Sequence, residues 1–255
     1  MDEGSAVLST DKAWKRWGKQ DPYFGVLAHE RFAAGEIGRN RDEFFATGRE
    51  FTARLLRQYE RHFGALSRER SLDHGCGVGR LTLPLATQFS SVVGLDISPD
   101  MLAEAEANAR RSEIANAEFA LADDSLSYAS GHFDFVNSHM VLQHVPARRG
   151  FAILLRLIEL VRPGGGFHIH LCFRTDRGLP RLLYWASANI AGVKVWQNIC
   201  ARRRWNAPAM QMNHYPLAKV LRELRRRGIY DVLITTEQYS RFITCSLLGR
   251  KPDNR

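Results

Sequence analysis

A carboxylate and three alternating glycines stand in the run DHGCGVG, which covers residues 73–79. The glycines are Gly75, Gly77 and Gly79, and glycine lets a backbone take positive φ or lie directly against a ligand. An apolar run precedes Asp73 and a helix-like run follows Gly79, so these residues form a turn between a strand and a helix. The first N–H groups of that helix lack partners within it and attract electron-rich ligands. The sequence therefore predicts a ligand-binding turn.

The spacing of the glycines and a second acid narrow the choice of ligand. Arg80 stands where a dinucleotide-binding G-x-G-x-x-G turn has its third glycine, which argues against that pattern. Asp96 ends the next apolar run, 17 residues after Gly79, close to the roughly 20 expected for a carboxylate that binds ribose hydroxyls. Capping a helix is the alternative role of Asp96, but Ser98 and Pro99 already begin the next helix. We therefore expect a nucleoside whose ribose lies against Asp96.

Two further regions are expected to bind the base of that nucleoside. Ile97 is placed to pack on the face of adenine, and Met101, in the first turn of the following helix, is placed to line the same pocket. After the third predicted strand, Asp123 is expected to accept a hydrogen bond from the adenine amino group, with Asp124 as its close rival. Turn formation is the alternative role for both acids.

The segments that must position these residues alternate between strand-like and helix-like runs. The predicted strands cover residues 70–74, 91–96, 117–122, 133–138, 167–173, 231–236 and 241–248, and the predicted helices cover 42–63, 80–89, 99–111, 147–161 and 216–227. This alternation predicts an α/β fold with a doubly wound, mostly parallel sheet of seven strands and helices on both faces. Residues 1–40 are expected to be irregular.

The order of these motifs resembles that of the S-adenosylmethionine-dependent methyltransferases of the Rossmann-like class, in particular those that act on small molecules. The resemblance covers residues 70–175 and rests on DHGCGVG, Asp96, FD at 133–134, VLQH at 141–144 and RPGG at 162–165. It implies S-adenosyl-L-methionine as cofactor, S-adenosyl-L-homocysteine as product and an antiparallel last strand. It also implies a set of cofactor-binding residues: Asp73, Gly75, Cys76, Gly77, Gly79, Asp96, Ile97, Met101, Asp123, Asp124 and Ser138.

Methyl transfer mainly requires that the nucleophile is placed in line with the methyl group, and a general base is needed only if the acceptor loses a proton. His139 and His144 follow the fourth predicted strand, at the sheet edge where ligands bind in such folds, and are candidate catalytic and substrate-binding residues. The resemblance supports His144, because a histidine is common there in the family, but either side chain can instead hold a loop. Tyr23 and Tyr215 are further candidates for substrate contact. The histidines expected to be structural are His168 and His170.

We expect a single domain at residues 41–255, preceded by a segment at 1–40 that covers the cofactor. Residues 174–215 form a long insert after the fifth predicted strand, apolar and aromatic over 180–200. Long connections of this kind are often functional, so the insert is expected to be a helical cap over the acceptor substrate. A helical pair packed on the edge of the sheet is the alternative.

Length, charge and cysteine content limit the class of protein. The chain has 255 residues and 45% hydrophobic content, enough for a full core. Its net charge of +9 permits a nucleic-acid partner, although no RNA-binding motif accompanies it. No apolar run is long enough to span a membrane, no metal site is indicated, and the four cysteines have no paired spacing. We therefore expect a cytoplasmic protein with reduced thiols.

The leading hypothesis is a methyltransferase that methylates an O, N or C atom of a small, partly hydrophobic molecule. An RNA or protein methyltransferase is the first alternative, supported by the basic charge. A non-catalytic module that binds S-adenosylmethionine is the second. An NAD-dependent oxidoreductase is the third, and Arg80 disfavours it.

Overall fold

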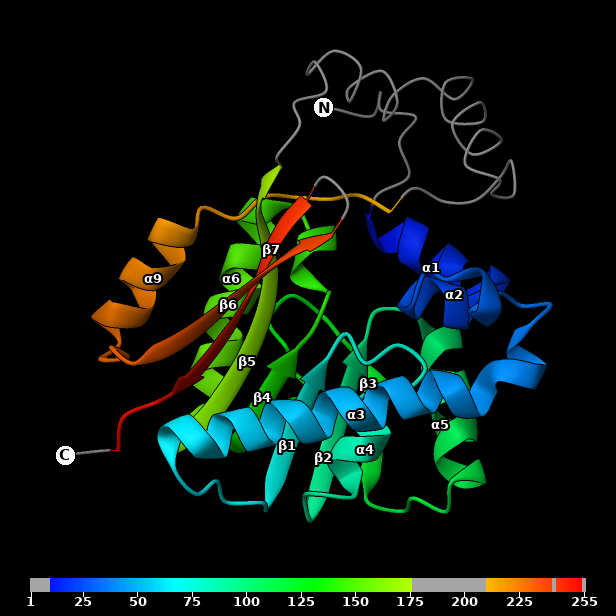
Figure 1. The fold of residues 1–255 in the computed structure, drawn as a ribbon, viewed down its shortest axis with the longest axis horizontal. Coiled ribbons are helices and arrows are strands. Elements are labelled where there is room, and N and C mark those ends of the chain that lie inside the picture. The colour runs from blue at the N-terminus through cyan, green and yellow to red at the C-terminus, as the bar shows by residue number, and fades with distance from the viewer. Residues whose placement is uncertain (1–9, 176–209, 240–241, 254–255) are drawn as a thin grey trace.

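Seven strands form one sheet through the middle of the molecule (Figure 1). They are β1 (Arg70–His74), β2 (Ser91–Asp96), β3 (Ala117–Leu121), β4 (Phe133–Ser138), β5 (Val161–Thr175), β6 (Val232–Tyr239) and β7 (Phe242–Arg250). Their order is β3-β2-β1-β4-β5-β7-β6. Strands β1 to β5 are parallel, and β7 is antiparallel to both β5 and β6. The predicted doubly wound sheet and its antiparallel last strand are confirmed.

This description rests on a computed structural model and covers residues 10–175, 210–239 and 242–253. Most of the insert expected to cap the acceptor, residues 176–209, lies outside the described residues. The helices are α1 (Thr10–Gln20), α2 (Pro22–Val26), η1 (Glu30–Phe32), α3 (Ile37–Phe63), α4 (Thr82–Ala86), α5 (Pro99–Arg111), η2 (Leu142–His144), α6 (Ala147–Leu160) and α9 (Leu217–Arg226). In the described part of the chain, none of them is both long and apolar enough to cross a membrane.

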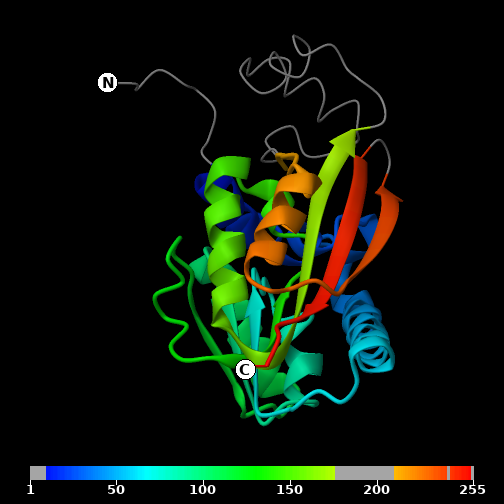
Figure 2. The ribbon, with the colours of Figure 1, turned by 90° about the vertical axis from the view of Figure 1, so that its left-hand side faces the viewer.

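Helices cover both faces of the sheet. Figure 2 shows α6 and α9 on one side of the strands and α3 on the other. One hydrophobic cluster joins α6 and α9 to the sheet, and a second joins α3 and α4 to the opposite face. A third cluster joins α1, α2 and α3 to Met101 of α5. The N-terminal helices therefore pack beside the strand ends rather than on a face of the sheet.

Several predicted boundaries were wrong, among them the start of α3, which is Ile37 instead of residue 42. Residues 10–26, expected to be irregular, form α1 and α2, because Trp17 and Tyr23 become buried in the third cluster. Helix α4 covers Thr82–Ala86 instead of residues 80–89, and beyond it the Ser90 N–H donates to the Arg68 carbonyl at 2.7 Å. Strand β5 begins at Val161 instead of residue 167, and its glycine run lies in a register shift against β4.

Strand β5 carries one glycine that sets how closely α3 can approach. A Cβ atom built on Gly166 would lie 2.4 Å from the ring of Tyr59 and 3.0 Å from that of Phe135. The two rings meet edge to face, with centroids 5.9 Å apart. Tyr59 of α3 therefore packs directly on the backbone of β5, which no larger residue at this position would permit.

Gly166→Ala is expected to lower the free energy of unfolding by about 1–3 kcal/mol, because the added methyl group overpacks this contact. The matched control is Gly38→Ala in the first turn of α3, where a Cβ meets nothing within 4 Å. The control should be neutral or stabilise by up to about 1 kcal/mol. Urea unfolding of both variants measures the difference, and equal effects would contradict this packing.

Candidate nucleoside site

The glycine-rich turn follows β1 and is bonded to the end of β2. Gly75, Gly77 and Gly79 have φ angles of 72°, 54° and 86°, in the left-handed region that favours glycine. The N–H groups of Gly75 and Cys76 both donate to the Leu95 carbonyl, at 2.7 and 3.0 Å. The turn is therefore held against the next strand by its own backbone.

Asp96, the last residue of β2, binds the turn through its side chain. The Gly77 N–H donates to Oδ2 and the Ser98 N–H to Oδ1, both at 2.9 Å. Burial raises the pKa of Asp96, and hydrogen bonds from the backbone N–H groups of Ser98, Gly77 and Ile97 oppose that rise. Each carboxylate oxygen accepts one of these two bonds and keeps a lone pair for another donor. Ile97 lies half-buried beside it.

Two valines pack on the turn from different sides. A Cβ atom on Gly77 would lie 2.4 Å from Val26, the last residue of α2. A Cβ atom on Gly75 would lie 2.2 Å from Val141, which precedes η2. The N-terminal helices also cover the start of α5, where a Cβ on Gly25 would lie 3.1 Å from Met101. Met101 is buried there, so this residue, predicted to bind the base, lies under the N-terminal helices.

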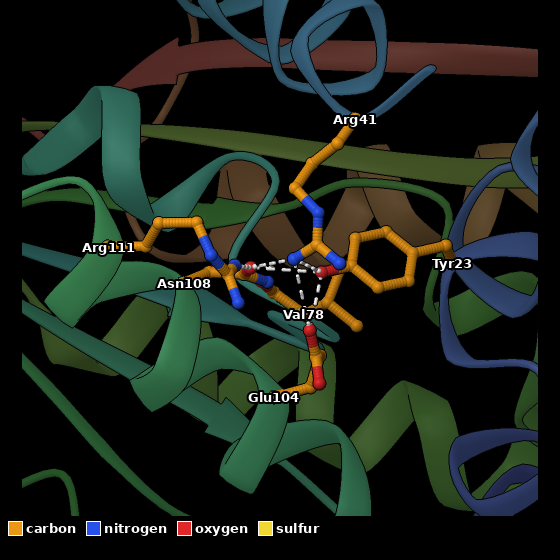
Figure 3. Close-up of polar contacts among 6 residues, drawn as sticks. All are labelled: Tyr23, Arg41, Val78, Glu104, Asn108 and Arg111. Atoms are coloured by element: carbon orange, nitrogen blue, oxygen red, sulfur yellow. Dashed lines mark hydrogen bonds and ion pairs between the residues drawn. The ribbon is translucent and has the colours of Figure 1, made fainter. Parts of the chain in front are cut away.

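Tyr23 fastens α2 to α3 and α5 (Figure 3). Its hydroxyl accepts a hydrogen bond from Arg41 at 2.8 Å and lies 2.5 Å from Glu104 Oε1 and 2.9 Å from Asn108 Oδ1. Asn108 in turn donates from Nδ2 to the Val78 carbonyl in the glycine-rich turn, at 3.0 Å. Tyr23, predicted to contact the substrate, therefore directs its hydroxyl to α5. Asn108 connects it to the glycine-rich turn through one hydrogen bond on each side.

Asp73 is buried beneath the turn. It accepts hydrogen bonds from Thr82 at 2.6 Å and from the Asn137 amide at 2.7 Å. The Asn137 oxygen lies 2.8 Å from His168 Nδ1, and His168 Nε2 lies 3.2 Å from the Ser246 hydroxyl. The resulting chain of hydrogen bonds crosses β1, β4, β5 and β7. Both ring nitrogens of His168 are engaged in it, which fits the structural role expected for this residue.

Asp123 and Asp124 are exposed, and both have partners within the protein. Asp123 accepts hydrogen bonds from the Ser127 hydroxyl at 2.5 Å, the Ser127 N–H at 2.9 Å and the Ser125 hydroxyl at 2.9 Å. These bonds, chiefly those from Ser127, lower the pKa of Asp123 to about 2. Asp124 pairs with Arg149, which also pairs with Asp11 of α1. Turn formation, the alternative role for these acids, fits Asp123, and Asp124 helps to hold α1.

The remaining polar cofactor candidates are buried at the same edge of the sheet. Ser138 ends β4, and its hydroxyl lies 3.0 Å from His74 Nδ1. Cys76 is buried in the turn, where burial raises the pKa of its thiol well above the ordinary value. The thiol therefore stays protonated, and Ser138 presents its main chain rather than its hydroxyl.

His144, the first candidate catalytic residue, is engaged at both ring nitrogens. Its Nδ1 lies 2.7 Å from the Gln211 carbonyl, and its Nε2 lies 3.4 Å from the Gln143 amide nitrogen. Because the carbonyl needs a donor, the proton sits on Nδ1 and Nε2 accepts. Burial lowers the pKa of His144 to about 4, so the ring is neutral. Tyr215 supports the same loop by donating to the Leu142 carbonyl at 2.7 Å.

His139, the second candidate, has a different environment. Its Nδ1 is buried with no hydrogen-bond partner in the described part of the chain. Its ring lies 4.1 Å from that of Phe51, 5.0 Å from that of His170 and 5.5 Å from that of His168. Burial, with smaller effects of neighbouring positive charge, lowers the pKa of His139 well below its usual value. His139 is therefore a neutral ring with a nitrogen available to a ligand.

A cavity of about 750 Å³ lies beside this group, between α3 and strands β5 to β7. Phe51 and His168, both ring contacts of His139, form part of its wall, with Arg54, Arg57 and Arg61 of α3. Sequence reasoning gave α3 only a packing role. The available signal was the placement of these arginines on one face of an amphipathic helix, beside the apolar face that packs on the sheet. Among the described residues, no three His, Cys, Asp or Glu side chains are grouped as a metal ion would require.

Comparisons with known proteins agree with this geometry. Residues 72–165 match the family model of the methyltransferase domain. Over 120 residues the chain is 38% identical to a trans-aconitate 2-methyltransferase of Deinococcus radiodurans, covering 46% of this chain and 43% of that protein. Over 78 residues it is 46% identical to a 23S rRNA (uracil(1939)-C(5))-methyltransferase of Aeromonas salmonicida, covering 29% of this chain and 18% of that protein.

Among solved structures, the magnesium protoporphyrin IX methyltransferase of Synechocystis with bound S-adenosylmethionine is similar at a TM-score of 0.60 and 17% identity. The match covers 97% of this chain and 100% of that one, and it shows a shared fold. The chain spans less than half the length of the two curated relatives. Residues 72–165 therefore match the methyltransferase domain in sequence, and the sheet has the fold of that solved structure.

Asp73→Asn is expected to change how stability depends on pH. Burial raises the pKa of Asp73 from 3.8 to about 6, so folding favours the protonated carboxyl. The free energy of unfolding therefore falls as the pH rises from about 4 to about 6, by up to about 3 kcal/mol from this group. Asparagine does not titrate, so urea unfolding should show wild-type stability falling relative to the variant over this range. A difference that stays constant with pH would contradict the assignment.

Proposed function

We propose that this chain, whose residues 72–165 match the methyltransferase domain, is an S-adenosyl-L-methionine-dependent methyltransferase that acts on a small, partly hydrophobic acceptor. The observation that carries the proposal is the hydrogen bond from the Gly77 N–H to Asp96, which joins the glycine-rich turn to the end of β2. These strand ends lie at the edge where parallel α/β sheets bind ligands. Both curated relatives described above are named methyltransferases, which supports the reaction.

The residues around the turn suit the parts of this cofactor. The free lone pairs of Asp96 suit the two ribose hydroxyls, and apolar Ile97 and Met101 suit the adenine ring. Asp123 Oδ2 accepts one hydrogen bond, from Ser127, and keeps a lone pair for the adenine amino group. The positive-φ glycines and the main chain of Ser138 suit the methionine part, because they bring backbone close to a ligand.

The bound cofactor supplies a methyl group on a sulfonium sulfur, whose carbon–sulfur bond breaks as the acceptor atom bonds to the methyl carbon. The protein's residues then have to align the acceptor and exclude water. We assign the acceptor contact to His139, because its Nδ1 has no partner among the described residues. We assign His144 to holding its loop, since both of its ring nitrogens are engaged.

The N-terminal segment is assigned to closing the cofactor site. Val26 packs on the turn, and Tyr23 fastens α2 to α5 over the start of the helix that carries Met101. The insert at 174–215 is assigned to capping the acceptor. Its described end contacts η2, where the Asn213 N–H donates to the Gln143 carbonyl at 2.6 Å.

A small acceptor is favoured over RNA. The apolar composition of residues 180–200 suits a hydrophobic substrate. The basic charge keeps RNA as the second candidate. We place the protein in the cytoplasm, a reducing compartment that suits the free thiols of Cys76, Cys172 and Cys245.

Replacing Asp96 tests the cofactor assignment. Asp96→Asn and Asp96→Ala should weaken binding of S-adenosylhomocysteine by about tenfold or more, because each loses charge-assisted hydrogen bonds to the ribose. Asp100→Ala, an exposed acid in the first turn of α5, is the matched control and should bind as wild type does. Calorimetric titration measures all four proteins, with NAD as the control ligand and thermal unfolding as the check on folding. Unchanged affinity in folded Asp96 variants would refute the ribose contact.

A further inference from the structure

Three buried nitrogen atoms, on side chains from the glycine-rich turn, the end of β4 and the middle of β5, have no hydrogen-bond partner within the described residues. They are Nδ1 of His139, Nδ1 of His170 and Nε of Arg80. The side chains of His170 and Arg80 are only 4% and 7% exposed. Leaving a buried polar atom unpaired is destabilising, so such atoms normally mark the place of a missing partner.

The chemistry of these three groups restricts that partner. The Nε–H of Arg80 is always a donor, and a neutral imidazole can turn its single N–H toward an acceptor. The rings of His139 and His170 lie 5.0 Å apart. Within the described part of the chain, the Arg80 guanidinium donates to the Thr47 hydroxyl at 3.3 Å and forms no ion pair. All three groups are therefore suited to donate hydrogen bonds to an oxygen atom of a ligand.

The charged groups around His139 are two arginines, Arg54 on α3 and Arg80 in the turn, and each lowers the pKa of His139 in addition to burial. The neutral rings of His168 and His170 face it from β5. His170 faces His139 and His144, and burial lowers its pKa to about 4.

One carboxylate does raise the pKa of Arg80 by its charge, but both of its oxygens already accept hydrogen bonds from other residues. This is Asp73, whose two oxygens accept hydrogen bonds from Thr82 and Asn137. A protonated histidine is therefore disfavoured in this region, whereas a bound anion is stabilised.

The neighbouring cavity is also lined by positively charged side chains, which lie at the protein surface. Its α3 wall holds Arg54, Arg57 and Arg61, all exposed and without an ion-pair partner in the described residues. Glu237 is the acid among its lining residues, opposite three arginines. Phe51 and Leu55 add apolar side chains to the lining of the cavity. A ligand with an apolar body and an anionic group matches both features.

We propose that the acceptor presents an anionic oxygen, a carboxylate or an ionised phenol, to the donors His139, His170 and Arg80, and reaches them through the cavity beside α3. This inference rests on the proposed function and names its acceptor class. An oxygen that is already ionised supplies the electron pair for the new oxygen–carbon bond, so no proton has to leave and no base is needed. His139 and His170 are then donors that position the oxygen.

The test uses the full-length protein and two pairs of small probes. Benzoate is compared with benzamide, which has nearly the same shape without the charge, and 4-nitrophenolate is compared with 4-nitroanisole. Dissociation constants are measured by calorimetry with and without saturating S-adenosylhomocysteine. We expect the anion of at least one pair to bind about tenfold more tightly than its neutral partner. The pair that shows the preference identifies the carboxylate or the phenol, and no preference in either pair would overturn the proposal.

Substitutions locate the site. Arg80→Met and His170→Gln should each weaken binding of the preferred anion by about tenfold and leave that of its neutral partner unchanged. Arg148→Met, an exposed arginine on α6, is the matched control and should have no effect. An Arg80→Met protein that loses S-adenosylhomocysteine but keeps the anion would assign this arginine to the cofactor and overturn its role here.

Wild-type protein provides a readout that needs no variant. The ring Cε1–H signals of His139 and His170 are followed by NMR as a function of pH, with and without the anion. A bound anion stabilises imidazolium, so the titration should move to higher pH. Unchanged titrations would overturn the proposal. Binding of S-adenosylhomocysteine without anion preference would refute only the acceptor class, whereas anion preference without S-adenosylhomocysteine binding would refute the methyltransferase.

Discussion

The site depends on one hydrogen bond, from the Gly77 N–H to the carboxylate of Asp96. It links the turn after β1 to the end of β2 and so fixes both walls of the proposed nucleoside site. The same contact also has an electrostatic effect, because backbone N–H groups oppose the rise in the pKa of Asp96 that burial causes. Gly77 forms this bond with a φ of 54°, which a residue with a Cβ rarely adopts.

The rest of the molecule supports this link from two sides. Beneath it, Asp73 begins a chain of hydrogen bonds that reaches Ser246 and links four strands. Above it, Tyr23 and Val26 bring the N-terminal helices onto the turn and onto α5. The proposed acceptor group around His139 lies between these layers and the basic face of α3. The cofactor and the acceptor would thus meet where neutral and positive groups surround the reacting atoms.

Strands and the glycine-rich turn were predictable because their signals are local. The apolar run before Asp73, the alternating glycines and the acid at Asp96 all lie within a short stretch of sequence, and the structure places them as expected. The helix α1 was not predictable, because its eleven residues include few apolar ones and are stabilised by tertiary contacts of Trp17. Short helices of this composition do not form on local propensity alone.

The roles of the histidines also required the structure. His139 and His144 are the same residue type five positions apart, yet only His144 is bonded to Gln211, which comes much later in the chain. Likewise, His168 and His170 alternate on one strand, and only His168 meets partners at both nitrogens. Such long-range contacts leave no pattern in the sequence around a histidine. The arginines of α3, in contrast, recur at the spacing of one helix face.

Hydrogen exchange with and without S-adenosylhomocysteine tests the central claim most directly. If the linked turn and strand end form the cofactor site under the N-terminal helices, ligand should protect residues 72–80, 94–101 and 10–26. Helix α9 lies on the face of the sheet away from α3. Its exchange rates should not change with ligand, so it serves as the internal control. Protection confined to other regions, or protection of these residues by NAD instead, would contradict the account.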